Sequence, residues 1–77
     1  MRDRVKAVMA AVFGLRPSEI PDDLALGHSD CWDSVRHMSL VLALEDAFRV
    51  TFSVEEIVEM TTLPRILKTL DEKLAAA

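Results

Sequence analysis

The hydrophobic positions near the start of the chain recur with a helical period. The apolar residues that fall on one helix face, at i, i+3, i+4 and i+7, are Val5, Val8, Met9 and Val12. Gly14 can end such a helix, and Pro17 prevents it from resuming. The pattern therefore predicts an amphipathic helix over about residues 2–14.

Residues 15–33 carry the signals of a long loop. Pro17, Pro21 and Gly27 are interspersed with Asp and Ser residues, which favour turns. A loop of this length is unusual in a small domain and is often functional. Its apolar residues, which we expect to hold it against a core, are Leu15, Ile20, Leu24 and Leu26.

The second half of the chain predicts three more helices. Asp33 is a good N-cap for a helix that runs to about Phe48. The S-x-x-E sequence of residues 53–56 is a capping box, and it predicts a short helix to about residue 60. Thr61 or Thr62 then caps the last helix.

Pro64 falls in the first turn of that last helix, where proline is tolerated. The expected buried stripe of this helix consists of Leu63, Ile66, Leu67, Leu70 and Leu74. No segment alternates with period two, so no sheet is expected. We predict an all-α four-helix bundle with a long first loop and a short third helix, forming a single domain over residues 1–77.

The helix predicted after Asp33 has two apolar faces. At about 100° per residue, the core face comprises His37, Leu40, Val41, Leu44 and Phe48. Val35, Met38 and Leu42 fall on nearly the opposite side. Scattered apolar surface residues are common, but three at i, i+3 and i+7 with a flexible Met at their centre favour a surface that docks a partner.

The charges extend this interpretation. There are 9 basic and 13 acidic residues, for a net charge of −4, which is a poor basis for binding nucleic acid. Arg36 borders the apolar stripe. The acids that we expect to steer a basic protein partner toward it are Glu45, Glu55, Glu56 and Glu59.

The cysteine content, the apolar runs and the spacing of possible metal ligands predict the cellular compartment and the absence of a metal. Cys31 is the only cysteine, so no intramolecular disulfide can form, which is typical of a reducing compartment. No apolar run is long enough to span a bilayer, and the first residues do not fit a signal peptide. We expect a cytoplasmic monomer that binds no metal, because Asp, Glu and His residues lack metal-ligand spacing.

Ser34 is the candidate functional residue. It follows the Asp33 cap, and a helix N-terminus favours a phosphate group. Alone this is a weak signal, since many serines begin helices. A hydrolase triad of Ser34, His37 and Asp30 or Asp33 is the rival interpretation, disfavoured because nothing indicates an oxyanion hole or a substrate cleft.

A family resemblance makes the case specific. The sequence Asp33-Ser34-Val35 at the start of a helix resembles the Asp-Ser-Leu motif of acyl carrier proteins. The Leu-Glu-x-x-Phe-x-Val-x-Phe pattern of residues 44–52 and the Ser-Val-Glu-Glu-Ile of residues 53–57 are also similar to that family. The resemblance covers essentially the whole chain.

The resemblance implies a carrier and not an enzyme. A phosphopantetheinyl transferase, using coenzyme A and magnesium, would attach a 4′-phosphopantetheine arm to Ser34. An activating ligase would load an acyl or aminoacyl group as a thioester on the arm, and a downstream synthase or transferase would receive it. The alternatives are a peptidyl carrier protein of nonribosomal peptide synthesis and, in a different class, a small helical adaptor that binds a partner helix.

Three residues differ from the fatty-acid carriers of that family. They are Trp32, Arg36 and His37. The Trp-Asp-Ser sequence of residues 32–34 resembles that of freestanding carriers of specialised pathways. Together the three residues argue against a role as the main fatty-acid carrier, and with it against a deep pocket for long chains. Trp32 is either a plug that packs where the loop meets the helix or a contact for partner enzymes, and the sequence leaves both open.

Overall fold

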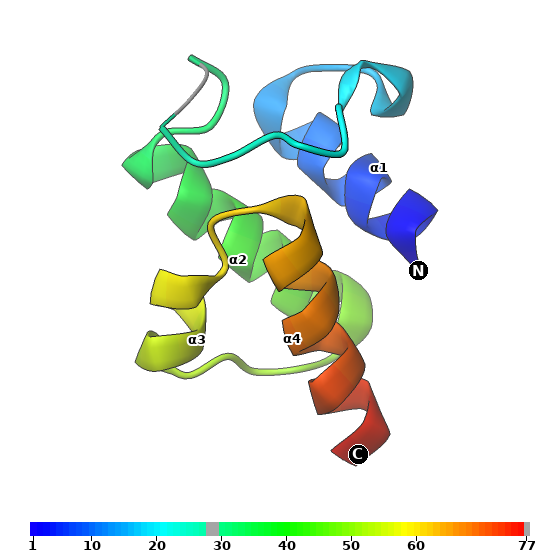
Figure 1. Ribbon diagram of the computed structural model, residues 1–77, viewed down its shortest axis with the longest axis vertical. Coiled ribbons are helices and arrows are strands. Elements are labelled where there is room, and N and C mark those ends of the chain that lie inside the picture. The colour runs from blue at the N-terminus through cyan, green and yellow to red at the C-terminus, as the bar shows by residue number, and fades with distance from the viewer. Residues whose placement is uncertain (28–29, 77) are drawn as a thin grey trace.

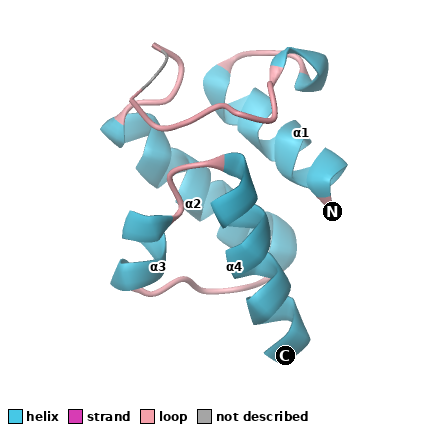
Figure 2. Cartoon of the chain, viewed as in Figure 1, coloured by secondary structure: helices cyan, strands magenta, loops and turns pink. Residues whose placement is uncertain are grey.

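The computed structural model describes residues 1–27 and 30–76, and it is built from helices (Figures 1 and 2). Its elements in chain order are α1 (Arg2–Phe13), the 3₁₀ turn η1 (Pro17–Glu19), α2 (Ser34–Phe48), α3 (Val54–Glu59) and α4 (Leu63–Ala76). The described residues form no strand beyond one isolated bridge between Ala25 and Thr62. The predicted all-α four-helix architecture is confirmed.

The ends of α1 and α2 follow from local chemistry. Gly14 ends α1 in the left-handed conformation, with φ of 73°, as its sequence position predicts. Asp33 begins α2, and its carboxylate accepts a hydrogen bond of 2.8 Å from the Arg36 amide. α2 ends at Phe48 as predicted, but the left-handed conformation of Arg49 after it, which usually favours glycine, was not foreseen.

The predicted capping box of α3 is present. The Glu56 amide donates to Ser53 Oγ over 3.2 Å, and the Ser53 amide donates to Glu56 Oε1 over 2.8 Å. The cap of α4 is settled in favour of Thr62, whose Oγ1 accepts from the Arg65 amide over 3.3 Å. Pro64 is the second residue of α4, where its missing N–H costs no helical hydrogen bond.

The core lies where the four helices meet. All five residues of the predicted α2 core face are buried. In α4, Leu63, Ile66 and Leu70 are fully buried and Leu67 is half-buried. The prediction was wrong for Leu74, which is 38% exposed, because the end of α4 projects past the other helices (Figure 1).

The long first loop is held against this core as predicted. Ile20 and Leu24 are buried, whereas Leu15 and Leu26 are half-buried against the same cluster. The Leu26 amide also donates to the Thr61 carbonyl over 2.9 Å, a contact with the α3–α4 connection that the sequence does not reveal. Residues 28 and 29 of the loop, including His28, lie outside the described residues.

Candidate functional site

Ser34 is the first residue of α2, and its side chain is exposed. The Asp33 cap directly before it fixes the start of the helix. The first amides of a helix have no carbonyl partner within the helix, and the helix dipole makes this end positive. The position can therefore accommodate a phosphate ester on the Ser34 hydroxyl, and nothing of the core covers it.

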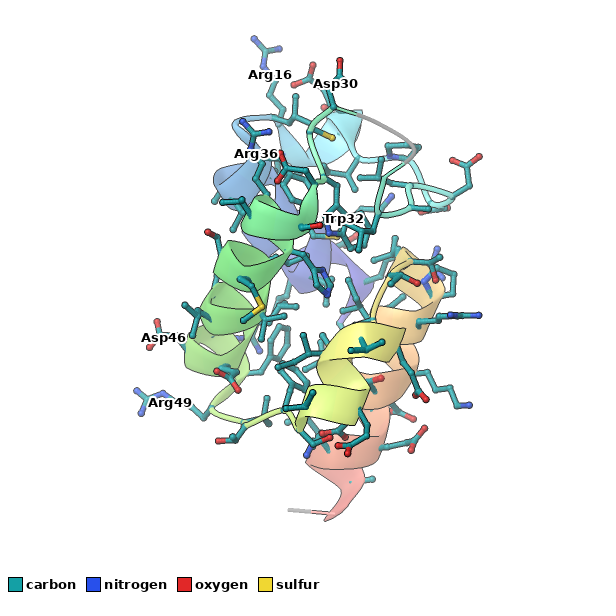
Figure 3. The ribbon with its side chains drawn as sticks, turned by 90° about the vertical axis from the view of Figure 1, so that its left-hand side faces the viewer. Arg16, Asp30, Trp32, Arg36, Asp46 and Arg49 are labelled. Atoms are coloured by element: carbon teal, nitrogen blue, oxygen red, sulfur yellow. The ribbon has the colours of Figure 1, made fainter. Side chains whose placement is uncertain are left out.

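Arg36 ties the end of the loop to the start of α2 (Figure 3). Its Nη1 donates to the Asp30 carbonyl over 3.0 Å and lies 3.6 Å from the Asp33 carboxylate. Because both partners precede Ser34 by at most four residues, this side chain fastens the segment before the serine to the first turn of α2. Its predicted contact with a partner enzyme stays a prediction.

Trp32 is a plug and not a surface contact. Its side chain is 0% exposed, and its ring lies 5.6 Å from that of Phe13. The indole Nε1 donates to His37 Nδ1 over 3.1 Å. Of the two interpretations that the sequence leaves open, the contact with partner enzymes is therefore wrong, because the bundle buries the whole side chain.

His37 completes this buried contact. The side chain is 6% exposed, and its Nε2 lies 2.8 Å from the Ile57 carbonyl. That carbonyl belongs to the last turn of α3, where carbonyl groups have no hydrogen-bond partner within the helix. Since Trp32 donates to Nδ1, the proton resides on Nε2 and is donated to Ile57. Both nitrogens are engaged within the fold, so His37 is not placed as a base for Ser34.

The second apolar face of α2 is exposed as predicted. Val35 is 77%, Met38 48% and Leu42 63% exposed. The sequence reasoning missed two further exposed residues, Val54 and Val58 on α3, which runs beside α2 (Figures 1 and 3). Their i, i+4 spacing was the available signal. We call these five residues the α2–α3 apolar face.

The acids predicted to border this face divide into two kinds. Glu55 and Glu59 are exposed and have the freedom to meet a basic partner. Glu45 is half-buried and accepts from the Phe52 amide over 2.9 Å. Glu56 belongs to the α3 capping box, and its Oε1 lies 2.8 Å from Lys73 Nζ. The nearby ammonium group lowers the pKa of the Glu56 carboxyl. Glu45 and Glu56 therefore have roles in the fold, and their partner contacts stay predictions.

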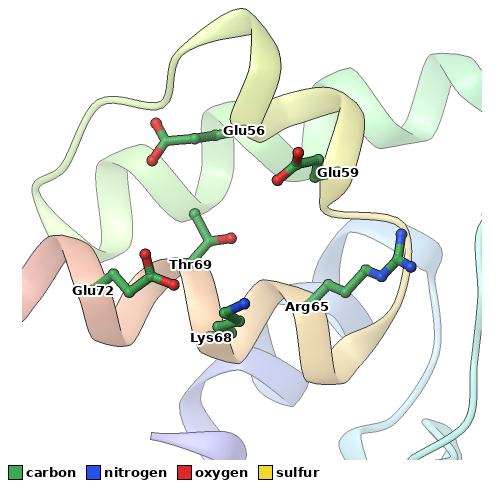
Figure 4. A pocket seen from close by; sticks show the side chains of 6 residues that line it. All are labelled: Glu56, Glu59, Arg65, Lys68, Thr69 and Glu72. Carbon is green, nitrogen blue, oxygen red and sulfur yellow. The ribbon is translucent and has the colours of Figure 1, made fainter.

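A polar hollow of about 430 Å³ lies between α3 and α4 (Figure 4). It is lined by Glu56, Glu59, Arg65, Lys68, Thr69 and Glu72. Acids and bases are mixed along its walls, so it has no single charge for a ligand to complement. Among the described residues no group of three or more His, Cys, Asp or Glu side chains could hold a metal ion.

The helical fold and the exposed serine at the start of α2 are the features of a carrier domain. The phosphopantetheine attachment site family matches residues 3–70, and the chain belongs to this family. A chain of this family is a carrier to which 4′-phosphopantetheine is covalently attached. Members of such a family are generally not catalytic.

The chain is also similar to named proteins of two kinds. It is 38% identical over 71 residues to the non-reducing polyketide synthase pkiA of Emericella nidulans, and 34% identical to pigA of Monascus ruber. Each of these two matches spans 92% of this chain but only 3% of the length of the synthase. An acyl carrier protein of Thermosynechococcus vestitus is 27% identical over 74 residues, which cover 96% of this chain and 91% of that protein.

Proposed function

We propose that Ser34 is the attachment residue and that the carrier serves an assembly line of polyketide type. The observation that carries the first part is the exposed Ser34 at the first position of α2, within Asp33-Ser34-Val35 and inside the matched residues 3–70. The second part is supported by the polyketide synthases, whose identity to this chain exceeds that of the acyl carrier protein. An aminoacyl cargo and an adaptor role are not favoured by these relatives.

The chain's own contribution is positional and electrostatic. Asp33 caps α2 and Arg36 holds the preceding backbone, so the Ser34 hydroxyl projects from a rigid helix end. The positive end of α2 stabilises the negative charge of a phosphodiester there. When bound, the arm supplies a terminal thiol that holds the acyl group as a thioester. A phosphopantetheinyl transferase with magnesium would supply the base that takes the Ser34 hydroxyl proton. The Ser34 oxygen would then bond to the phosphorus next to the pantetheine of coenzyme A, as the pyrophosphate bond breaks and adenosine 3′,5′-bisphosphate leaves. This chain is not itself an enzyme.

The α2–α3 apolar face is the proposed docking surface for successive partners. These are the transferase, an acyl-activating ligase and a downstream synthase or transferase. Its exposed apolar side chains are bordered by Glu55 and Glu59, a combination that suits a partner with an apolar patch ringed by basic residues. None of the described helices is long and apolar enough to cross a membrane. We propose that the carrier works as a monomer in the cytoplasm.

One experiment tests the attachment. The purified protein is incubated with coenzyme A, magnesium and a broad-specificity phosphopantetheinyl transferase, and its intact mass is measured. We expect the mass of one phosphopantetheine to be added, to be lost in Ser34→Ala and to persist in Ser39→Ala. Ser39 is a matched control, since it is exposed on the same helix. Unmodified protein in the presence of an active transferase would contradict the proposal.

A further inference from the structure

A second hollow, of about 480 Å³, lies within the long first loop, between its beginning and its end. It is lined by Leu15, Glu19, Pro21, Leu24, Asp30 and Cys31. Pockets for small organic groups have volumes of roughly 300 to 1,000 Å³ and mostly apolar walls. This hollow has such a volume and exposes mainly apolar surface, which sets it apart from the charged hollow between α3 and α4.

The loop keeps the hollow open. Ile20 and Leu24 anchor the loop to the core. Asp22 of the loop forms ion pairs with two residues of α1, with Lys6 over 2.7 Å and with Arg2 over 3.2 Å. Glu19 is held in place because its carboxylate accepts from the Arg16 amide over 2.8 Å. These contacts fix the walls of the hollow, since Glu19 and Leu24 are themselves part of its lining.

A short segment of chain joins the hollow to the attachment residue. Asp30 and Cys31, which line it, precede Ser34 by only four and three residues, and Arg36 fastens Asp30 to the start of α2. In contrast, the interior beside this helix end is filled by the rings of Phe13, Trp32 and His37. The hollow on the loop side is therefore the candidate seat for an apolar group tethered at Ser34, because the core beside the helix start is already occupied.

Two carboxylates determine what can enter. Glu19 and Asp30 both line the hollow, and no basic side chain among residues 1–27 and 30–76 does. A chain that ends in a carboxylate would be repelled there, whereas an uncharged apolar chain buries its surface against Leu15, Pro21 and Leu24.

We infer that this hollow seats the uncharged, apolar part of the acyl group carried on Ser34 and selects against acyl groups that end in a carboxylate. The inference rests on the proposed attachment at Ser34. It adds a cargo site on the loop side of the molecule, separate from the α2–α3 apolar face that partners would use.

The test uses nuclear magnetic resonance of the whole, isotope-labelled chain. The transferase loads Ser34 from three stable coenzyme A analogues whose acyl groups are acetyl, octanoyl, and a chain of the octanoyl length that ends in a carboxylate. Intact mass verifies each loading. Relative to the acetyl form, we expect the octanoyl form to shift the amide signals of Leu15, Leu24 and Cys31, and the carboxylate form to leave them unchanged.

A substitution within the hollow provides the second readout. Leu15→Glu adds a charge to its wall and should remove the octanoyl-dependent shifts at Leu24 and Cys31. Leu67→Glu is the matched control, because Leu67 is also half-buried but lies on α4 and outside this hollow.

The outcomes separate the two proposals. Verified loading with octanoyl shifts confined to α2 and α3, or with no such shifts, would overturn the cargo site alone. Equal shifts for the octanoyl and carboxylate chains would overturn the selectivity. Failure of the transferase to add anything to Ser34 would overturn the proposed attachment, and the cargo site with it.

Discussion

Trp32 Nε1 donates a hydrogen bond to His37 Nδ1 over 3.1 Å inside the bundle. The same imidazole reaches the Ile57 carbonyl with its other nitrogen, over 2.8 Å. One buried ring thus connects the end of the first loop, α2 and α3. Because these two residues flank Ser34 in sequence, the conformation of the serine segment is coupled to the position of α3.

This contact predicts a specific loss of stability. His37→Phe keeps a ring of similar shape but leaves the Trp32 N–H and the Ile57 carbonyl without a partner, at a cost of about 1–3 kcal/mol for each buried group. We expect urea unfolding, followed by circular dichroism, to show a clearly lower free energy of unfolding. Ser39→Ala, on the exposed side of α2, should change it by less than about 0.5 kcal/mol. Equal stability of the two variants would contradict the buried contact.

The Asp33 cap separates helix stability from recognition. Asp33→Ala should destabilise the protein by about 1 kcal/mol, whereas Asp33→Asn should preserve stability, because asparagine caps helices as well as aspartate does. If the transferase recognises the carboxylate itself, Asp33→Asn will be modified more slowly although it remains fully folded. The measurements are thermal unfolding and the initial rate of mass addition. A loss of stability in Asp33→Asn equal to that in Asp33→Ala would contradict the capping role.

Acid should weaken the contact between α3 and α4. Lys73 and the Ser53 amide lower the pKa of the Glu56 carboxyl in the folded state. The stability that the ionised Glu56 carboxylate contributes is therefore complete above the ordinary carboxyl pKa of about 4.3. It is lost as the pH falls through the lower pKa that this carboxyl has in the folded state. We expect Glu56→Gln to flatten the decline of stability below about pH 4.

Glu55→Gln is the control for that measurement. Glu55 is exposed on the same helix, and its substitution should leave the pH dependence unchanged. The measurement is the denaturant midpoint of unfolding as a function of pH across the acid range. An identical pH dependence for Glu56→Gln and the unmodified chain would argue against the ion pair.

The α2–α3 apolar face predicts a loss of recognition without a loss of stability. Leu42 is 63% exposed, so Leu42→Asp should fold normally yet lower the kcat/KM of the transferase about tenfold, a change of about 1.4 kcal/mol. Leu74→Asp provides the comparison, because Leu74 is also exposed but lies near the end of α4. If both variants are modified at the rate of the unmodified chain, the transferase does not dock on this part of α2.

Most of the fold was predictable because local chemistry determines it. Gly14, Asp33 and the Ser53–Glu56 capping box begin or end helices through contacts within one turn, and the period of apolar residues identifies the core faces. The left-handed conformation of Arg49 was not predictable, since no local preference of arginine favours it.

The site was predicted less completely, because several roles depend on distant neighbours. The position of Ser34 follows from the cap before it. Whether Trp32 faces the core or the solvent depends on Phe13 and His37, which no spacing in the sequence reveals. Glu56 likewise looks like a surface acid until Lys73, 17 residues later, is found beside it.

The most direct test of the account is to locate the arm on the chain. After reaction with coenzyme A and the transferase, the protein is digested and its peptides are fragmented in a mass spectrometer. The account predicts that the phosphopantetheine resides on Ser34 alone. Its presence on Ser18, Ser29, Ser39 or Ser53, or its absence from every peptide, would contradict the account.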